Sequence, residues 1–309
     1  MTTQAPSPHA AETHIHDHYI DWSPAPYPCR VLTPAASTSC EPLLVLGGGL
    51  QNRHSWARLE RRLCPDHQLL IPDLPPARSP GQTRTSLTWD DLTQAALAAA
   101  DQLRTTRFAV LAVSSGYPVG YRLAQQHPTR ITRLMLFGAA PHPTPRLAAL
   151  IKEGLDREAA APQTATTDSR RSTAARLVDV LTNPQAAQQH LLMKVAAHVM
   201  LEQLTASPHD PLTRYVFDRG ALLLKEPLPP GGLTGIPALV GVGEYDTATT
   251  VEDNRAVAQT IAGSTFLVMQ RADHLLHLER DADFATAVSL FLHDQSLRTL
   301  SHSVIEQMP

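Results

Sequence analysis

The sequence has little of several residue types that mark specialised proteins. Its 309 residues include three cysteines, an odd number whose spacing fits neither a disulfide framework nor a metal motif. This usage is typical of a reducing compartment, so we expect a cytoplasmic protein. Charged residues make up 18% of the chain, and the formal net charge is only −3. Because the basic residues do not cluster, we expect no nucleic acid partner.

Long apolar runs are also lacking. The longest hydrophobic stretches fall well short of the roughly 20 residues that a membrane-spanning helix needs. The first thirty residues lack the basic start and apolar core of a secretory signal. We therefore expect neither a membrane partner nor export, and the sequence leaves the oligomeric state open.

An alternation of strand and helix patterns is present instead. Apolar runs of strand length are repeatedly followed by amphipathic segments of helix length. Strands are predicted at 18–22, 29–32, 42–46, 68–72, 108–113, 131–137, 238–242 and 265–269. Helices are predicted at 54–64, 89–103, 117–126, 251–262 and 282–293. This order predicts an α/β fold with a mostly parallel central sheet and helices on both faces.

The alternation breaks between residues 141 and 235, where only helical patterns occur. These patterns lie at 145–158, 172–181, 184–204 and 211–224. We interpret the segment as a helical cap, or lid, inserted into a core made of residues 18–140 and 236–297. Residues 1–17 and 298–309 are expected to be terminal tails. Apolar cap positions are candidates either for a substrate pocket or for the cap's own core: Leu150, Leu191, Leu192, Val195, Met200, Leu201 and Val216.

Three histidines alternate near the amino terminus, namely His14, His16 and His18. In a strand, alternate side chains share one face. We interpret them as surface residues at a strand edge, with a metal site as the less favoured alternative.

The most informative segment is Ala112–Gly116, which joins an apolar strand pattern to a helical pattern. A serine on a tight strand-to-helix turn requires small residues two positions to either side. Ala112 and Gly116 meet this requirement for Ser114, whereas the residues that flank Ser115 are large. We predict Ser114 as a nucleophile, and the alternative is a loop serine that caps a helix.

A nucleophilic serine needs a base and a carboxylate that orients the base. Asp246 follows one late strand and is the predicted acid, with Glu244 in reserve. His274 follows the next strand and is the predicted base, with His277 as its competitor. Asp273 is a further candidate partner for the imidazole. Alternatively, Asp246 only caps the next helix, and His274 is a polar loop residue.

The negative charge that develops on a substrate oxygen also needs N–H donors, and losing one costs roughly 3 kcal/mol of barrier. The backbone N–H of Ser115, directly after the nucleophile, is one predicted donor. The second is expected from the glycine-rich turn Gly47–Leu50, whose glycines allow close approach to a ligand. The alternative is a turn that merely needs unusual φ values. Phosphate binding is not indicated, because the glycine spacing is wrong.

The motifs, taken together and in their order along the chain, resemble those of the α/β-hydrolase superfamily over residues 43–292. The segments that carry the resemblance are Leu46–Trp56, Pro72–Pro75, Ala112–Gly116 with Leu123-Ala124 and His127-Pro128 beyond it, Gly243–Asp246 and His274–Glu279. The resemblance implies that Gly49 supplies the second oxyanion N–H. We also expect Leu50 and Tyr117 to contact the substrate. The sequence departs from the family pattern at Gly47, Ala112 and Asp273, where histidine, glycine and glycine are usual.

The sequence thus predicts a serine-dependent hydrolase of an ester, thioester or lactone, acting on a small acyl substrate without cofactor or metal. Two alternatives remain open. The same triad serves acyl transfer, cyclisation or elimination in a biosynthetic pathway, or the fold is a ligand-binding protein with a vestigial site.

Overall fold

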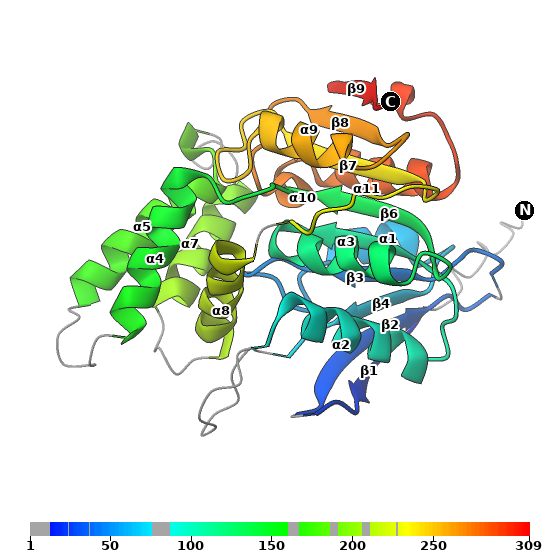
Figure 1. The fold of residues 1–309 in the computed structure, drawn as a ribbon, viewed down its shortest axis with the longest axis horizontal. Coiled ribbons are helices and arrows are strands. Elements are labelled where there is room, and N and C mark those ends of the chain that lie inside the picture. Colours follow the sequence, from blue (N-terminus) through cyan, green and yellow to red (C-terminus); the bar gives the residue numbers. More distant parts are fainter. Residues whose placement is uncertain are drawn as a thin grey trace, which may run out of the picture.

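The computed structural model describes residues 13–23, 25–36, 38–75, 87–159, 167–185, 191–205, 211–226 and 228–309. These residues form one nine-stranded sheet in the order β1-β2-β4-β3-β5-β6-β7-β8-β9 (Figure 1). The strands are β1 (His14–Ile20), β2 (Tyr27–Thr33), β3 (Leu43–Leu46), β4 (Leu69–Pro72), β5 (Phe108–Val113), β6 (Ile131–Phe137), β7 (Ala238–Gly243), β8 (Thr265–Met269) and β9 (Ser303–Gln307). Neighbours from β4 to β8 pair in parallel, and β1, β2 and β9 add antiparallel pairs. The predicted α/β fold with a mostly parallel sheet is confirmed.

Helices cover both faces of the sheet (Figure 1). One face packs on α2 (Trp89–Gln102), α3 (Tyr117–Gln126) and α9 (Val251–Gln259), and the other on α1 (Ala57–Leu63) and α11 (Asp281–Leu292). Successive residues of β5 enter the two cores in turn, as the strand period of two requires. Because both faces are covered, the strands read as continuous apolar runs. Within the described chain, no helix combines the length and apolarity needed to cross a membrane.

Between β6 and β7, the described residues include four helices that form a separate layer at one end of the sheet, on the left in Figure 1. They are α4 (Pro145–Ala159), α5 (Thr167–Leu181), α7 (Leu191–Thr205) and α8 (Pro211–Lys225). Their apolar cluster includes Leu150, Leu177 and Met200, and it also takes in Ala248 and Leu275 from the loops after β7 and β8. The helical layer therefore packs onto the carboxyl ends of the parallel strands.

The expected inward role of three residues of α7 is corrected by the structure. Leu191 is 75% exposed, Val195 is 51% exposed and Leu192 is also exposed. Met193 and Met200 form the buried face of this helix instead. The helix is apolar nearly all round, so its sequence pattern did not indicate which face packs.

Both expected terminal tails contain strands. β1 begins at His14 rather than after residue 17, and it pairs on one side only, as an edge strand. Its histidines His14 and His16 are exposed, as expected for surface positions. β9 lies within the expected tail over 298–309 and pairs with β8, because the backbone N–H and C=O groups of β8 need partners on that side. The rest of the expected amino-terminal tail, residues 1–12, lies outside the described residues.

Candidate active site

Ser114 follows β5 directly and is the first residue of the short 3-10 helix Ser114–Gly116. The chain turns sharply here, and Ser114 has a φ of 50°. Both small neighbours of Ser114 lie at crowded positions. A Cβ on Gly116 would lie 2.5 Å from the carbonyl oxygen of Leu46, and Ala112 packs against Gly120 of α3. The structure therefore agrees with the need for small residues on both sides of Ser114, and Leu46 and Gly120 are among the groups that crowd them.

The structure brings together the three side chains that the sequence predicts for nucleophile, base and acid. Ser114 Oγ lies 2.8 Å from His274 Nε2, and His274 Nδ1 lies 2.8 Å from Asp246 Oδ2. The three residues follow β5, β8 and β7 at the carboxyl edge of the sheet. His274 and Asp246 are 4% and 5% exposed, so their contact is shielded from water. A carboxylate at Nδ1 leaves Nε2 free to accept the serine proton.

The carboxylate of Asp246 has further partners. Its Oδ1 accepts from the backbone N–H groups of Ala248 and Thr249, and its Oδ2 accepts from the Thr249 hydroxyl at 2.8 Å. Burial by itself lowers the pKa of His274. The charge of Asp246 and its hydrogen bond to the ring raise the pKa by more than this, and the charge of Asp273 raises it further. The pKa of His274 is therefore raised above its usual value.

The two alternative acids do not hydrogen-bond to the imidazole. Glu244 is exposed and accepts from the backbone N–H of Arg271. The buried carboxylate of Asp273 accepts from the backbone N–H groups of Leu275 and Asn183, at 2.7 and 2.5 Å. Asp273 thus ties the loop of His274 to the end of α5, and burial raises its pKa.

The competing histidine, His277, supports the glycine turn. Its Nε2 lies 2.6 Å from Gln51 Nε2, and Gln51 Oε1 accepts from the N–H of Gly48 at 2.6 Å. The amide nitrogen of Gln51 is a donor, so His277 must accept at Nε2. Burial, together with the nearby His274, lowers the pKa of His277 to about 3, which keeps the ring neutral as this bond requires.

The glycine turn that carries the predicted oxyanion donor Gly49 lies next to Ser114 and to the other predicted donor, Ser115. A Cβ on Gly48 would lie 2.8 Å from the Cβ of Ser114, so only glycine permits this approach. A Cβ on Gly49 would lie 3.6 Å from the hydroxyl oxygen of Ser115. No hydrogen bond from the Gly49 N–H reaches another described residue, whereas the N–H of Gly48 is occupied by Gln51.

A cavity of about 110 Å³ opens above these groups, beneath the helical layer. Ser114 and His274 line this cavity, and so do Leu50 and Tyr117, the two residues expected to contact a substrate. The hydroxyl of Tyr117 donates to the carbonyl of Ala140, so the ring supplies the contact surface. Apolar side chains of the cap complete the wall: Leu147, Ile151, Leu177, Leu181, Val216 and Leu223. Of the cap positions proposed from the sequence, only Val216 lines this cavity.

One cation stands in this apolar wall. Arg219 of α8 is 4% exposed, and its guanidinium lies 4.6 Å from the ring centre of Tyr215 and 5.9 Å from that of Trp89. Its Nη1 has no hydrogen-bond partner among the described residues. Arg219 therefore places a positive charge in the wall of the cavity.

Sequence reasoning missed three residues that shape the site: Gln51, Gly138 and Thr249. Gly138 follows β6 with a φ of 66°, and a Cβ there would lie 2.9 Å from His274 Cε1. Because this glycine has no side chain, it leaves room for the imidazole at the end of β6. The local sequence around Thr249 shows only a polar turn, so no signal revealed its contact with Asp246.

Comparisons with known proteins agree with this architecture. The family model described as "Alpha/beta hydrolase family" matches residues 43–287. No curated protein matches the chain. Among solved structures, a thermophilic esterase from Thermogutta terrifontis is 19% identical with a TM-score of 0.68, and the match covers 91% of this chain and 98% of the esterase.

Two further structures share the fold. The enol-lactonase from Burkholderia xenovorans is 21% identical with a TM-score of 0.68, over 86% of this chain and 97% of that one. The meta-cleavage product hydrolase from Pseudomonas fluorescens is 15% identical with a TM-score of 0.61, over 87% and 95% of the two chains. At these identities the likeness concerns the fold.

Proposed function

The chain belongs to the alpha/beta hydrolase family, and we propose that it is a serine-dependent hydrolase of an ester, thioester or lactone. The observation that carries the proposal is the continuous hydrogen-bonded chain from Ser114 through His274 to Asp246, with both contacts at 2.8 Å. This arrangement activates a hydroxyl that is otherwise a weak nucleophile.

In the proposed reaction, Ser114 Oγ attacks the substrate carbonyl carbon while His274 Nε2 takes the hydroxyl proton. Asp246 holds the ring with Nδ1–H toward its own carboxylate and stabilises the imidazolium. The N–H groups of Ser115 and Gly49 bind the oxyanion. His274 then returns its proton to the leaving oxygen or sulfur, and the acyl group remains on Ser114. A water molecule, deprotonated by His274, releases the acid.

The cavity supports a small, largely apolar acyl group as the substrate class. Its walls are mainly leucine, isoleucine and valine side chains from the cap, which exclude water from the acyl group. The cation of Arg219 in this wall favours a substrate that carries a negative group. An esterase and an enol-lactonase share the fold, and their names agree with this reaction class.

The proposed setting is a reducing compartment such as the cytoplasm. All three cysteines are free thiols in the structure, and two of them are buried. Such thiols persist where disulfides do not form.

The test is covalent labelling followed by product analysis. A fluorophosphonate probe should add one adduct per chain on Ser114, found by peptide mass spectrometry, and Ser114→Ala should abolish labelling and turnover. Ser115→Ala is the matched control, because it keeps the backbone N–H and should still label. Labelling of Ser114→Ala at the rate of the unsubstituted protein contradicts the proposal.

Product mass separates hydrolysis from the alternative outcomes. With a library of aryl esters, thioesters and lactones in ¹⁸O-labelled water, hydrolysis places one heavy oxygen in the acid product. A product with no added water instead indicates transfer, cyclisation or elimination on the same serine.

A further inference from the structure

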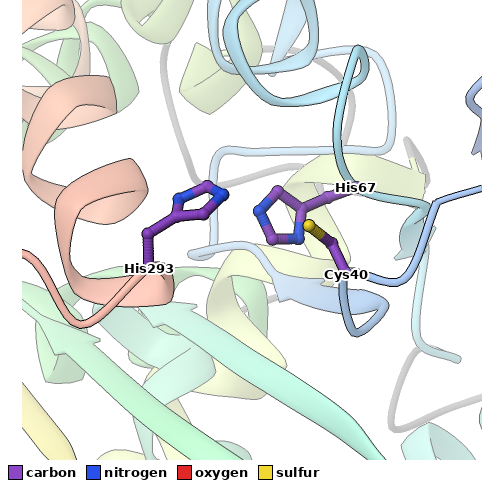
Figure 2. Close-up of side chains that lie close together, drawn as sticks. All are labelled: Cys40, His67 and His293. Carbon is purple, nitrogen blue, oxygen red and sulfur yellow. The ribbon is translucent and has the colours of Figure 1, made fainter.

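A second cluster of reactive side chains lies away from Ser114, and Figure 2 shows its members: Cys40, His67 and His293. One potential ligand atom from each residue lies within 4.8 Å of the other two. Cys40 precedes β3, His67 precedes β4, and His293 ends α11. The cluster therefore sits at the amino ends of the parallel strands, at the opposite edge of the sheet from Ser114.

The hydrogen bonds of both histidines set the same tautomer. His67 Nδ1 lies 3.0 Å from the carbonyl oxygen of Glu41, and His293 Nδ1 lies 2.8 Å from that of Ser289. A carbonyl oxygen only accepts, so each Nδ1 carries the proton and each Nε2 presents a lone pair. Metal-bound histidines in proteins show this pattern, in which the second nitrogen donates to a carbonyl that orients the ring.

The side chain of His67 provides an independent sign of a missing partner. His67 is 3% exposed, and its buried Nε2 has no hydrogen-bond partner in the described part of the chain. A buried polar nitrogen without a partner costs free energy of about 1–3 kcal/mol. The two rings stand edge to face with centres 5.1 Å apart, and Figure 2 shows a ring nitrogen of each turned toward the other ring.

From this juxtaposition we propose that Cys40, His67 and His293 form a Zn²⁺ site. Two imidazole nitrogens and one thiolate are the ligands that zinc prefers, and a water molecule completes the tetrahedron. When the zinc–sulfur bond forms, the Cys40 thiol releases its proton to solvent. The three ligands are far apart in the sequence, which is why their spacing shows no metal motif.

Binding requires only small side-chain movements. Ligand atoms around tetrahedral zinc lie roughly 3.3–3.8 Å apart, from bond lengths of about 2.0–2.3 Å. The atoms here are within 4.8 Å, and the two outer residues are free to close this gap because Cys40 is half-buried and His293 is exposed. His67 is held by packing and by Glu41, so it is the fixed member.

The neighbouring charges are compatible with a cation. Arg133 lines a pocket together with Cys40 and His67. Its guanidinium is paired with Glu41 at 3.4 Å and with Asp294 at 2.5 Å. The thiolate of Cys40 neutralises half of the metal charge. Bound zinc would tie the starts of β3 and β4 to the end of α11, so its expected effect is on stability rather than on the chemistry at Ser114.

The experiment is zinc binding to the full chain after chelator treatment. Equilibrium dialysis with metal analysis should give one Zn²⁺ per chain, and zinc should raise the melting temperature. Co²⁺ in its place should show the absorption band of a cobalt–thiolate bond. Cys40→Ser should abolish that band, and both Cys40→Ser and His293→Ala should weaken zinc binding more than about tenfold. Neither residue is a fully buried core side chain, so both variants are expected to fold.

His16→Ala is the matched control, because His16 belongs to the exposed alternating histidines of β1 and should leave zinc binding unchanged. The proposal is overturned if the chain binds no zinc at micromolar concentration. It is also overturned if Cys40→Ser and His293→Ala bind zinc as the unsubstituted protein does, or if binding is lost in His16→Ala.

Discussion

His274 Nε2 lies 2.8 Å from Ser114 Oγ, although 160 positions separate the two residues in the chain. Each follows the carboxyl end of a parallel strand, and β6 and β7 lie between those strands in the sheet. The distance therefore depends on the loops after these strands as well as on the two residues themselves. Three of the five predictions below test the groups that set the position and charge of the imidazole.

Gly138→Ala should lower kcat/KM by far more than its small loss of folding stability would explain. The new Cβ would lie 2.9 Å from His274 Cε1 and displace the ring from Ser114. Gly235→Ala is the control, since Gly235 also has a positive φ, of 75°, but no atom within 4 Å of a new Cβ. Both variants bear a φ penalty of about 1 kcal/mol, measured by thermal unfolding. Equal kcat/KM in the two variants would show that crowding of His274 is irrelevant.

Thr249→Val should reduce kcat by about tenfold, because it removes a hydrogen bond to a buried carboxylate. The hydroxyl donates to Asp246 Oδ2 at 2.8 Å and helps to hold the atom that orients His274. Thr249→Ser keeps the hydroxyl and should restore most of the rate. The measurement is kcat and KM for the three proteins, with KM expected to change little. A similar loss in both variants would indicate a packing role instead.

Gln51→Leu should lower kcat with little change in KM. The side chain bridges His277 to the N–H of Gly48, and its loss frees the turn that carries the predicted oxyanion donor Gly49. The expected loss is about tenfold to a hundredfold, below the cost of deleting a donor outright. Gln94→Leu, on an exposed pair with Gln126, is the control and should retain full activity. An unchanged kcat in Gln51→Leu would remove this bridge from the mechanism.

The rate should fall on the acid side with a midpoint above pH 6.5. The imidazole of His274 accepts the proton of Ser114 only when neutral, and its pKa is raised above 6.5 by Asp246 and Asp273 against the effect of burial. As pH falls through that pKa, kcat/KM should decline with a slope of one. Asp273→Asn removes one raising charge, so its midpoint should move to lower pH. A midpoint at or below 6.5 in the unsubstituted protein would show that Asp246 and Asp273 do not raise the pKa of His274 against the effect of burial.

The free energy of unfolding should depend on pH through the carboxyl group of Glu279, which is protonated in the folded state over part of the pH range. Burial and the Asp273 charge raise the pKa of Glu279 from 4.5 to about 7. The folded state then holds a proton that the unfolded state has lost, so this group's stabilising contribution falls as pH rises from about 4.5 to about 7. Glu279→Gln should remove this slope and should be the more stable protein above pH 7.

Melting temperatures of the two proteins across that pH window provide the check, with Glu244→Gln as an exposed control. The informative quantity is the difference between the unsubstituted protein and Glu279→Gln. A difference that does not change with pH would mean that Glu279 titrates alike in the folded and unfolded chain.

Much of the fold could be predicted from the sequence, because buried segments have a characteristic local pattern of apolar residues. The continuous apolar runs at 43–46 and 108–113 mark strands covered on both faces. The turn at Ser114 was recognisable from two small residues, since steric crowding is a local property. Order along the chain was sufficient to place Asp246 and His274 at the same sheet edge.

The sequence-based predictions were wrong for elements whose structure depends on partners far away in the chain. β9 has a polar, half-buried pattern, and it is a strand because β8 lies beside it. The helix α7 is apolar nearly all round, so only packing against α5 and α8 decided that Leu191 faces outward. Periodicity reports that a segment can bury a face, but not against what.

Local sequence motifs alone predicted the type of chemistry, since a serine turn, a late carboxylate and a late histidine are each recognisable along the chain. Contacts between remote loops were decided only when the chain folded. Gln51 meets His277 across 226 positions, and Cys40 meets His67 and His293 from three separate segments. Such pairs carry no shared period or spacing, because the path of the backbone in space, rather than distance along the chain, sets which side chains touch.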